Sequence, residues 1–526
     1  MALRHRYLPI RGVSPEPFVV AADAMAAATA RQAGLRAHRR VDAADLLFAL
    51  ETVLGPEIAL RASLLLALRD PDFSARTPSR PWIRCVVGAL GVAALGTALM
   101  PAGAVLGAVS LAFGAIFLCV VAVKLLAVVP QRPGPARRRR HLSLQDLPVY
   151  SVLVPLFRET EVADQLVDGL LGLDYPREKL DIKIILEAED AATIAHFRAM
   201  RLPPCFEVII VPQGSPQTKP RALNYALYFA RGELVTIFDA EDIPHPSQLR
   251  LAAETFAAGP PRLACLQARL AFYRPGHNWL TRQFAIEYAA LFDLLLPALG
   301  RNRLPLMLGG TSNHFRAEVL RKIGAWDPFN VTEDADLGLR LARLGFEVDV
   351  IDSATDEEPN GRLPSWFRQR ARWIKGWMQT AIVHLASPAR LYSELGPERF
   401  FVVLALFASM VVSSFVHPLF LALTLWSIFR GTVLTGGPAI GTSLLVGLGL
   451  AVFTLGYGVS LLAGFMGIRA RGLKGFAGSL LTMPAYWLLI SAAAFLALWQ
   501  FFRNRFHWNK TEHGHMTQPF GSGDGR

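Results

Sequence analysis

Long apolar runs without charged residues lie on both sides of a mixed central region. The first run extends from Cys85 to Val123 and is interrupted near its middle by Pro101. A helix needs roughly 20 apolar residues to cross a bilayer, so this run predicts a hairpin of two membrane helices, which we place at 83–128.

Three further uncharged runs predict helices near 401–429, 440–467 and 480–502, within a membrane region at 400–502. Three spans would place the basic tail, 503–526, across the membrane from the cluster Arg137–Arg140, against the positive-inside rule. Either the first of these runs is bent at Pro418 into two short elements, or one run is re-entrant or interfacial. We expect the tail to be cytoplasmic.

Strand-like and helical patterns alternate between residues 144 and 398. The strand candidates are 149–155, 181–187, 206–212 and 232–240, and the helix candidates are 161–173, 219–230 and 335–345. This alternation predicts an α/β domain whose largely parallel sheet has helices on both faces. Ligands of such sheets bind beyond the carboxyl ends of the strands, which is where Asp239–Asp242 are expected.

Two other segments have helical patterns. Residues 1–80 predict a cytoplasmic helical region in which no catalytic cluster stands out. The segment Phe284–Leu299 is apolar but carries Glu287 and Asp293, so it looks too short and too charged to span a bilayer. It predicts either an interfacial helix or a buried core helix.

Composition and charge agree with a membrane protein. Apolar residues make up 52% of the 526 residues, charged residues make up 18%, and the net charge is +12. The basic residues flank the apolar runs, where they would face anionic lipid and the cytoplasm. Nucleic-acid binding would instead need Lys and Arg clustered on a soluble face among aromatic residues, so no nucleic-acid partner is expected.

Two acidic clusters are candidates for chemistry. Asp239 and Glu241, at a strand end, could bind a divalent cation that bridges two phosphates, or could belong to a solvated acidic turn. Thr332, Glu333 and Asp334 precede a helix, where Thr332 could cap the helix and the two acids could complement its dipole. Alternatively, one of these carboxylates could take a proton from an acceptor hydroxyl.

Two basic motifs complete the set. Lys219 at a helix start suits a diphosphate, or is an ordinary surface lysine. Gln369, Arg372 and Trp373 share one face of a helix, with Trp366 and Trp377 close to the same line. An indole packs on a sugar ring and an arginine presents a fork to phosphate oxygens, although a helix at the membrane interface is also rich in Trp and Arg.

The order and spacing of these motifs resemble the family 2 glycosyltransferases. Between Leu147 and Gln379, a strand ending in V-L-V-P is followed by an acidic strand end and then by K-x-x-A-L-N, D-A-E-D, T-E-D and Q-R-A-R-W. The chain resembles the processive membrane-bound group that contains bacterial cellulose synthase, hyaluronan synthase and exopolysaccharide synthases. This resemblance implies a cytoplasmic α/β catalytic domain of the GT-A (Rossmann-like) fold, inserted between transmembrane helices.

The resemblance also implies residue roles. Asp334 would be the general base, and Asp239 and Glu241 would bind Mg²⁺ or Mn²⁺. The donor would be bound by Pro155, Glu159, Glu187, Asp190, Lys219, Asp239 and Arg372. The acceptor would be bound by Thr332, Glu333, Gln369, Arg372 and Trp373. The second strand of the family usually ends in Asp-Asp-Gly; here it ends in E-A-E-D, and we favour Glu187 and Asp190 for the donor base.

The implied activity is inverting transfer from a UDP-sugar, with UDP-glucose expected, to a growing β-linked glycan. The implied location is the bacterial inner membrane, with the lipid bilayer as a partner and room for accessory export subunits. Two alternatives stay open: a transferase that adds a single sugar to a lipid acceptor, and a nucleotide-binding membrane transporter or scaffold.

Overall fold

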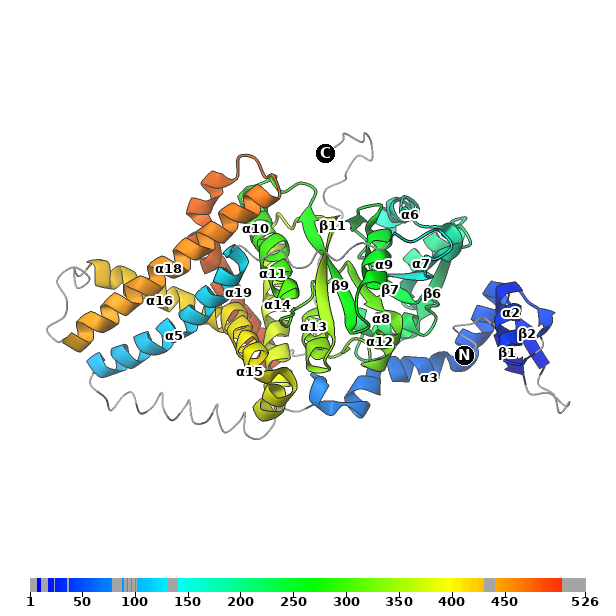
Figure 1. Cartoon of the computed structure of the whole chain (residues 1–526), viewed down its shortest axis with the longest axis horizontal. Helices are drawn as coiled ribbons and strands as arrows, with labels where there is room; N and C mark the ends of the chain where they lie inside the picture. Colours follow the sequence, from blue (N-terminus) through cyan, green and yellow to red (C-terminus); the bar gives the residue numbers. More distant parts are fainter. Residues whose placement is uncertain are drawn as a thin grey trace.

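The computed structural model describes residues 7–10, 18–22, 24–35, 37–77, 102–129, 141–429 and 440–503, and the single positions 88, 92, 96 and 100. Apart from these single positions, the first arm of the expected hairpin lies outside the described residues, as do the cluster Arg137–Arg140 and all of the basic tail after Arg503. Figure 1 shows three parts: a small N-terminal unit, a central sheet domain, and a bundle of long helices on the opposite side of that domain.

The first half of the central sheet is parallel, as predicted. Its strands have the order β6-β5-β4-β7, with β4 parallel to both β5 and β7. All four strand candidates from the sequence occur, as β4 (Tyr150–Leu156), β5 (Leu180–Glu187), β6 (Phe206–Val211) and β7 (Leu234–Ile237). β4, β5 and β7 are almost entirely buried, which explains their continuous apolar runs, whereas β6 is partly buried.

The second half of the sheet is mixed, so the expectation of a largely parallel sheet holds only in part. β10 (Asn313–Arg316) lies antiparallel between β7 and β9 (Leu263–Phe272), and β11 (Glu347–Glu357) is parallel to β9. The short β8 (Ile243–Pro244) pairs antiparallel with β11 at the edge. β10 has no apolar alternation because its polar side chains are used inside the protein; His314, for example, bonds the Tyr150 hydroxyl at 2.7 Å.

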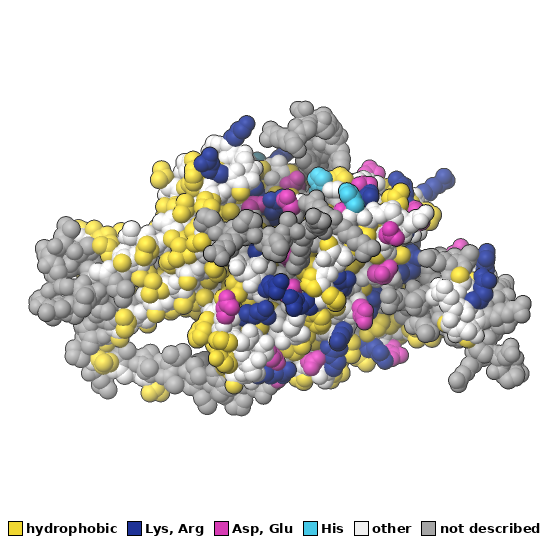
Figure 2. Space-filling model, in the orientation of Figure 1, with side chains coloured by type: hydrophobic (Ala, Val, Ile, Leu, Met, Phe, Trp, Pro, Cys, Tyr) yellow, Lys and Arg dark blue, Asp and Glu magenta, His cyan; other side chains and the backbone are white. Residues whose placement is uncertain are grey.

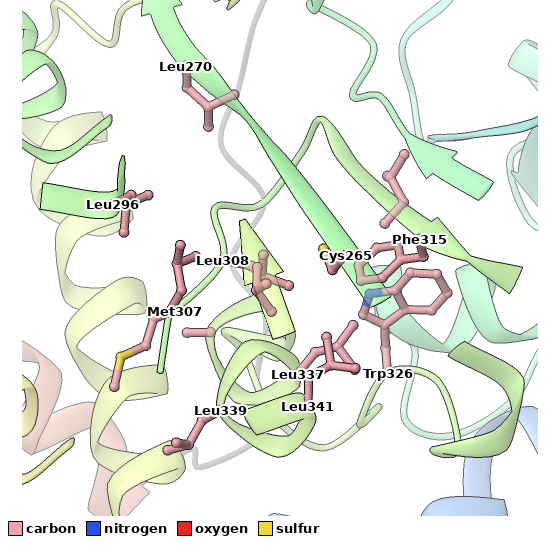
Figure 3. Packing of buried hydrophobic residues seen from close by; sticks show 14 of the residues in the cluster. Cys265, Leu270, Leu296, Met307, Leu308, Phe315, Trp326, Leu337, Leu339 and Leu341 are labelled. Carbon is pink, nitrogen blue, oxygen red and sulfur yellow. The ribbon is translucent and has the colours of Figure 1, made fainter. Parts of the chain in front are cut away.

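Helices cover both faces of this sheet. They are α6 (Ala163–Leu171), α7 (Ala191–Ala199), α8 (Lys219–Leu227), α9 (Gln248–Ala258), α12 (Ala317–Lys322) and α13 (Glu333–Arg343). Leu223 of α8 and Leu337 of α13 share one core cluster with Trp326. Figure 3 shows Leu337 and Leu341 on the side of α13 that faces Trp326 and Phe315, whose rings meet edge to face at 5.9 Å.

Five described helical segments are long and apolar enough to cross a membrane by length and composition: 111–128, 279–301, 388–426, 450–470 and 477–503. They belong to α5 (Ala102–Val128), α10–η5–α11 (Trp279–Ala289, Ala290–Leu295, Leu296–Arg301), α15–η6–α16 (Pro388–Phe407, Ala408–Val412, Ser413–Phe429), α18 (Ile440–Ala470), and η7–α19 (Ala477–Thr482, Met483–Arg503). In Figure 2, hydrophobic side chains gather over this part of the molecule and charged ones over the sheet domain.

The structure corrects the expected length of one of these segments and one of the two alternatives for another. The helix around Phe284–Leu299 is not short, because it begins at Trp279 with Asn278 as its cap and continues through a π-helical stretch to Arg301. Of this candidate span, 61% is buried inside the protein. The chain also stays helical through Pro418; its irregularities come earlier, at Gly396 (φ 75°) and in the π-helical η6.

The N-terminal unit is not purely helical, as the sequence had suggested. β1 (Tyr7–Ile10), β2 (Phe18–Ala21) and β3 (Ala37–Arg40) form a small sheet against α2 (Ala24–Gln32). α3 (Ala43–Arg69) then leaves this unit, runs along the sheet domain and ends beside the short helix η1 (Pro71–Phe73) (Figure 1).

Candidate active site

A cavity of about 700 Å³ lies at the carboxyl ends of β4, β5 and β7, between the sheet domain and the apolar helices. Its wall brings together residues that are far apart in the sequence. The predicted site residues that line it are Pro155, Glu159, Glu187, Lys219, Asp239, Glu241, Thr332, Glu333, Asp334, Gln369, Arg372 and Trp373.

Asp190 is used differently from the prediction. Its carboxylate caps α7 by accepting the Thr193 amide at 3.3 Å, and it accepts the Arg158 amide at 2.5 Å. At the end of β5 the cavity is lined instead by Glu187 and Glu189. Burial raises the pKa of Glu187 to about 7, partly offset by Arg221, whose guanidinium lies 3.8 Å away.

Lys219 begins α8 and turns its ammonium into the cavity. It forms an ion pair with Asp239 and donates to the carbonyl of Gly310 at 3.0 Å. Burial alone would lower the pKa of Lys219, but the carboxylates of Asp239 and Glu333 hold it above its usual value. The lysine is therefore a fixed positive charge at the strand ends.

Acidic side chains gather at the turn after β7, beside Lys219. Asp242 accepts the amide of Asp239 at 2.7 Å and the hydroxyl of Thr311, so it shapes the turn. Burial and the neighbouring Asp239 and Glu241 raise the pKa of Asp242 well above its usual value. Burial also raises the pKa of Glu357, at the end of β11, and the same acidic residues add to the shift.

This charge fits a divalent cation at Asp239 and Glu241, whose side chains line the cavity. Among the described residues there is no group of three or more His, Cys, Asp or Glu arranged to hold a metal ion. Mg²⁺ commonly takes one or two carboxylates and completes its shell with substrate phosphates and water, so two protein ligands are sufficient.

The segment Thr332–Asp334 enters α13 beside Lys219. Thr332 occupies the cap position, but its side chain makes no capping hydrogen bond, which corrects that part of the prediction. Burial, with the charge of Asp334, raises the pKa of Glu333 to about 7. Burial also raises the pKa of Asp334, against the nearby charges of Lys219 and Arg372.

The helix α14 (Leu363–His384) forms the opposite wall. Gln369, Arg372, Trp373 and Trp377 line the cavity, so the predicted shared face exists. Trp366 does not belong to it: it is fully buried, with its ring 5.4 Å from that of Tyr486 on α19. Burial lowers the pKa of Arg372, and the charges of Glu333 and Asp334 oppose that effect.

The sequence did not indicate Arg370 as a site residue, because only its neighbours Gln369, Arg372 and Trp373 belong to the Q-x-x-R-W motif. Its guanidinium makes a two-pronged ion pair with Glu287 on α10 and donates to the Tyr486 hydroxyl at 2.8 Å. The same group lies 4.8 Å from the centre of the Trp373 ring and 4.6 Å from that of Phe284. The signal available in the sequence was Glu287, one of two acids in the largely apolar segment Phe284–Leu299.

Comparison with known proteins agrees with this geometry. Residues 148–376 match the model of the family described as "Glycosyltransferase like family 2". A β-monoglucosyldiacylglycerol synthase from Synechocystis is 26% identical over 50% of this chain and 54% of its own length. Cellulose synthase 2 from Novacetimonas hansenii is 29% identical over 46% of this chain and 15% of its own. The chain thus spans about half of one relative and a small part of the other.

A solved structure is also similar. It is a mannosyltransferase from Pyrobaculum calidifontis in complex with GDP-Man and Mn²⁺, 19% identical, with a TM-score of 0.48 over 75% of this chain and 98% of its own. The central part of the chain thus matches the glycosyltransferase family 2 model over residues 148–376 and has a mixed sheet of the GT-A kind, with a cavity at the strand ends and flanking helices long and apolar enough to cross a membrane.

Proposed function

We propose that the chain is a processive inverting glycosyltransferase of the bacterial inner membrane. It would polymerise a UDP-sugar, UDP-glucose in the first instance, into a β-linked exopolysaccharide and pass the product across the membrane through its own helices. One observation carries this proposal: a single cavity joins Lys219, Asp239 and Asp334 to aromatic side chains from the long apolar helices.

The donor would lie over the strand ends, with the catalytic domain on the cytoplasmic side, where nucleotide sugars are made. Its base would lie near Pro155, Glu159 and Glu187, which line the end of the cavity at β4 and β5. Its diphosphate would contact Lys219 and Arg372. A divalent cation held by Asp239 and Glu241 would neutralise charge on the departing diphosphate.

Asp334 would accept the proton of the acceptor hydroxyl. The acceptor oxygen forms a bond to the anomeric carbon while the bond from that carbon to the diphosphate breaks, and the nucleoside diphosphate leaves with the electron pair. Burial raises the pKa of Asp334, which makes it a better proton acceptor once ionised. A single displacement converts an α-linked donor into a β-linkage.

The acceptor would enter from the side of the apolar helices. Trp373 and Trp377 line that side together with Phe284, Tyr288, Phe292 and Met410. Aromatic faces pack against sugar rings, so this wall suits a glycan end. The Q-x-x-R-W motif and the number of apolar helices favour a growing polymer.

A lipid acceptor is the second candidate, because one relative is named as a β-monoglucosyldiacylglycerol synthase. A nucleotide-binding transporter or scaffold is the third. It would have no need of Asp334, the acidic pair Asp239 and Glu241, and the Trp-bearing helix α14 around one cavity.

Radiolabelled nucleotide sugars, supplied to membranes containing the chain with Mg²⁺ or Mn²⁺, separate these candidates. A long product cut by a β-glucanase supports the polymerase, whereas one sugar on an extractable lipid supports the second candidate. Binding of a nucleotide sugar without turnover of any donor would leave only the transporter or scaffold. A matched Asp334→Asn membrane preparation controls for other transferases.

A further inference from the structure

The N-terminal arm, which we define as residues 58–77 from the last turns of α3 through η1, packs into the sheet domain. Phe73, Ser74 and Ala75 are no more than 2% exposed. Two guanidinium groups lie near the Phe73 ring, with Arg343 at 4.5 Å and Arg390 at 5.5 Å from the ring centre. The end of the arm is therefore buried in the protein, although Leu60 and Leu68 on its helical part are exposed.

The arm first contacts α8, the helix that begins with Lys219. The side-chain amide of Asn224 donates to the carbonyl of Ala62 at 3.1 Å and to that of Trp326 at 2.9 Å. Arg221 donates to the Ser63 hydroxyl at 3.2 Å. α8 is thereby fixed between the arm and the chain that leads to Asp334.

The arm then contacts the loop 327–334 directly. Asp327 is fully buried and accepts the Ser74 hydroxyl at 3.0 Å, the Ala75 amide at 2.6 Å and the Phe329 amide at 3.2 Å. The same loop accepts the hydroxyl of Thr218, the residue before Lys219, through the carbonyl of Pro328 at 3.1 Å.

α14 holds the same loop from the cavity side. Thr380 accepts the Asn330 side-chain amide at 2.9 Å, and Gln379 accepts the Val331 amide at 3.0 Å. The loop is thus hydrogen-bonded to the arm through Asp327. Through residues 330 and 331 it is hydrogen-bonded to α14, the helix that carries Arg372 and Trp373.

We propose that the N-terminal arm is a positioning element of the active site, with Ser74 and Asp327 as positioning residues. Its hydrogen bonds set the place of the loop that ends in Asp334 relative to Lys219 on α8. A shift of about 1 Å at a reacting group can cost on the order of 100-fold in rate, so such bonds matter for turnover even though neither residue lines the cavity. This inference rests in part on the proposed function, because turnover is one of its two readouts.

The test compares two buried Ser–Asp pairs in the full chain. Ser74→Ala removes the bond to Asp327. Ser151→Ala removes the bond from Ser151 to Asp181, which is 2.6 Å long and equally buried but lies at the far end of β4 from the cavity. Both should lower the thermal midpoint. Only Ser74→Ala should lower kcat, by about 10-fold, with the donor KM changed less than about twofold.

Hydrogen exchange gives a readout that does not depend on turnover. In the unaltered chain, the amide of Ala75 and those of residues 329–334 should open together, and in Ser74→Ala the loop amides should exchange faster than in Ser151→Ala. Equal kcat in Ser74→Ala and the unaltered chain would overturn the proposal. Rapid exchange of the Ala75 amide while the amides of residues 329–334 stay protected would also overturn the proposal. Absence of any turnover by the unaltered chain would instead count against the proposed function and leave the exchange test standing.

Discussion

Gly376 on α14 lies against Thr332 so closely that it has no room for a side chain. A Cβ added at position 376 would lie 2.8 Å from the Cβ of Thr332 and closer still to its Cγ2 and Oγ1. Gly376→Ala should therefore push the segment Thr332–Asp334 away from α14. We expect kcat to fall by at least about 10-fold and stability to fall by about 1–3 kcal/mol.

Gly169 on α6 is the matched control for that variant. A Cβ added there meets no atom within 4 Å, so Gly169→Ala should be neutral or stabilise the protein by up to about 1 kcal/mol. Thermal unfolding and steady-state kinetics of both variants check the prediction. Normal turnover in Gly376→Ala would mean that the exact position of Thr332 does not matter for catalysis.

The acid limb of the pH–rate profile should report the pair of Glu333 and Asp334. A general base works only when ionised, so the rate should fall as the pH drops through its raised pKa. Glu333→Gln removes a negative charge next to Asp334 and should move this limb to lower pH, because the repulsion between the two carboxylates is mutual. Asp334→Asn should abolish turnover and leave UDP binding nearly unchanged. An unmoved limb in Glu333→Gln would assign the titration to another group.

Arg370→Lys should impair acceptor use more than donor use. Lysine keeps the charge but loses the two-pronged pair with Glu287 and the contact of the guanidinium with the Trp373 ring, so the Trp373 indole should become mobile. We expect the acceptor KM to rise about 10-fold with little change in the donor KM. Arg282→Lys is the control, since Arg282 also packs on an aromatic ring, that of Phe476 at 5.4 Å, without lining the cavity. An equal effect of both variants would contradict the special position of Arg370.

Glu51 on α3 should make stability depend on pH. Burial raises its pKa from 4.5 to about 7, with Lys183 and the Ile210 amide partly offsetting the shift. The folded state therefore holds a proton more tightly than the unfolded chain. This contribution to stability is fully present below about pH 4.5 and is lost as the pH rises through about 7.

Glu51→Gln should accordingly raise the thermal midpoint at pH 8 and have little effect at pH 4.5. Glu57→Gln, which alters an exposed acid paired with Arg61 on the same helix, should show no such pH dependence. Parallel thermal curves for the unaltered chain and Glu51→Gln at every pH would remove Glu51 as the source.

The sequence was informative for the buried strands, whose apolar side chains form continuous runs. β4, β5 and β7 are nearly fully buried and β6 is partly buried, and the apolar runs located all four strands to within a few residues. β10 was not predicted, because its polar residues Asn313 and His314 bond inside the protein, to the Gly309 carbonyl and the Tyr150 hydroxyl, and leave no apolar pattern. The mixed half of the sheet follows from pairing between segments far apart in the chain, which local pattern does not specify.

The residues of the candidate site were likewise predicted only in part. Motif order located Lys219, Asp239, Asp334 and Trp373, all of which line one cavity. Motif order did not distinguish Glu189, which lines the cavity, from Asp190, which caps a helix, because both are acids at one strand end. Nor did it indicate the arm, since Ser74 contacts Asp327 across 253 positions of sequence.

The pair of Lys219 and Asp239 has a consequence for the order in which small molecules enter. The Lys219 ammonium already pairs with the Asp239 carboxylate, which a metal cation would need as a ligand. A metal cation must therefore displace the ammonium, which weakens its binding when it is the only ligand present. A diphosphate gives Lys219 a new partner and releases Asp239 at the same time. Binding of cation and nucleotide should then be strongly synergistic. Calorimetry should show weak heats for Mn²⁺ alone and tight binding once UDP is present, with each ligand strengthening the other by the same factor.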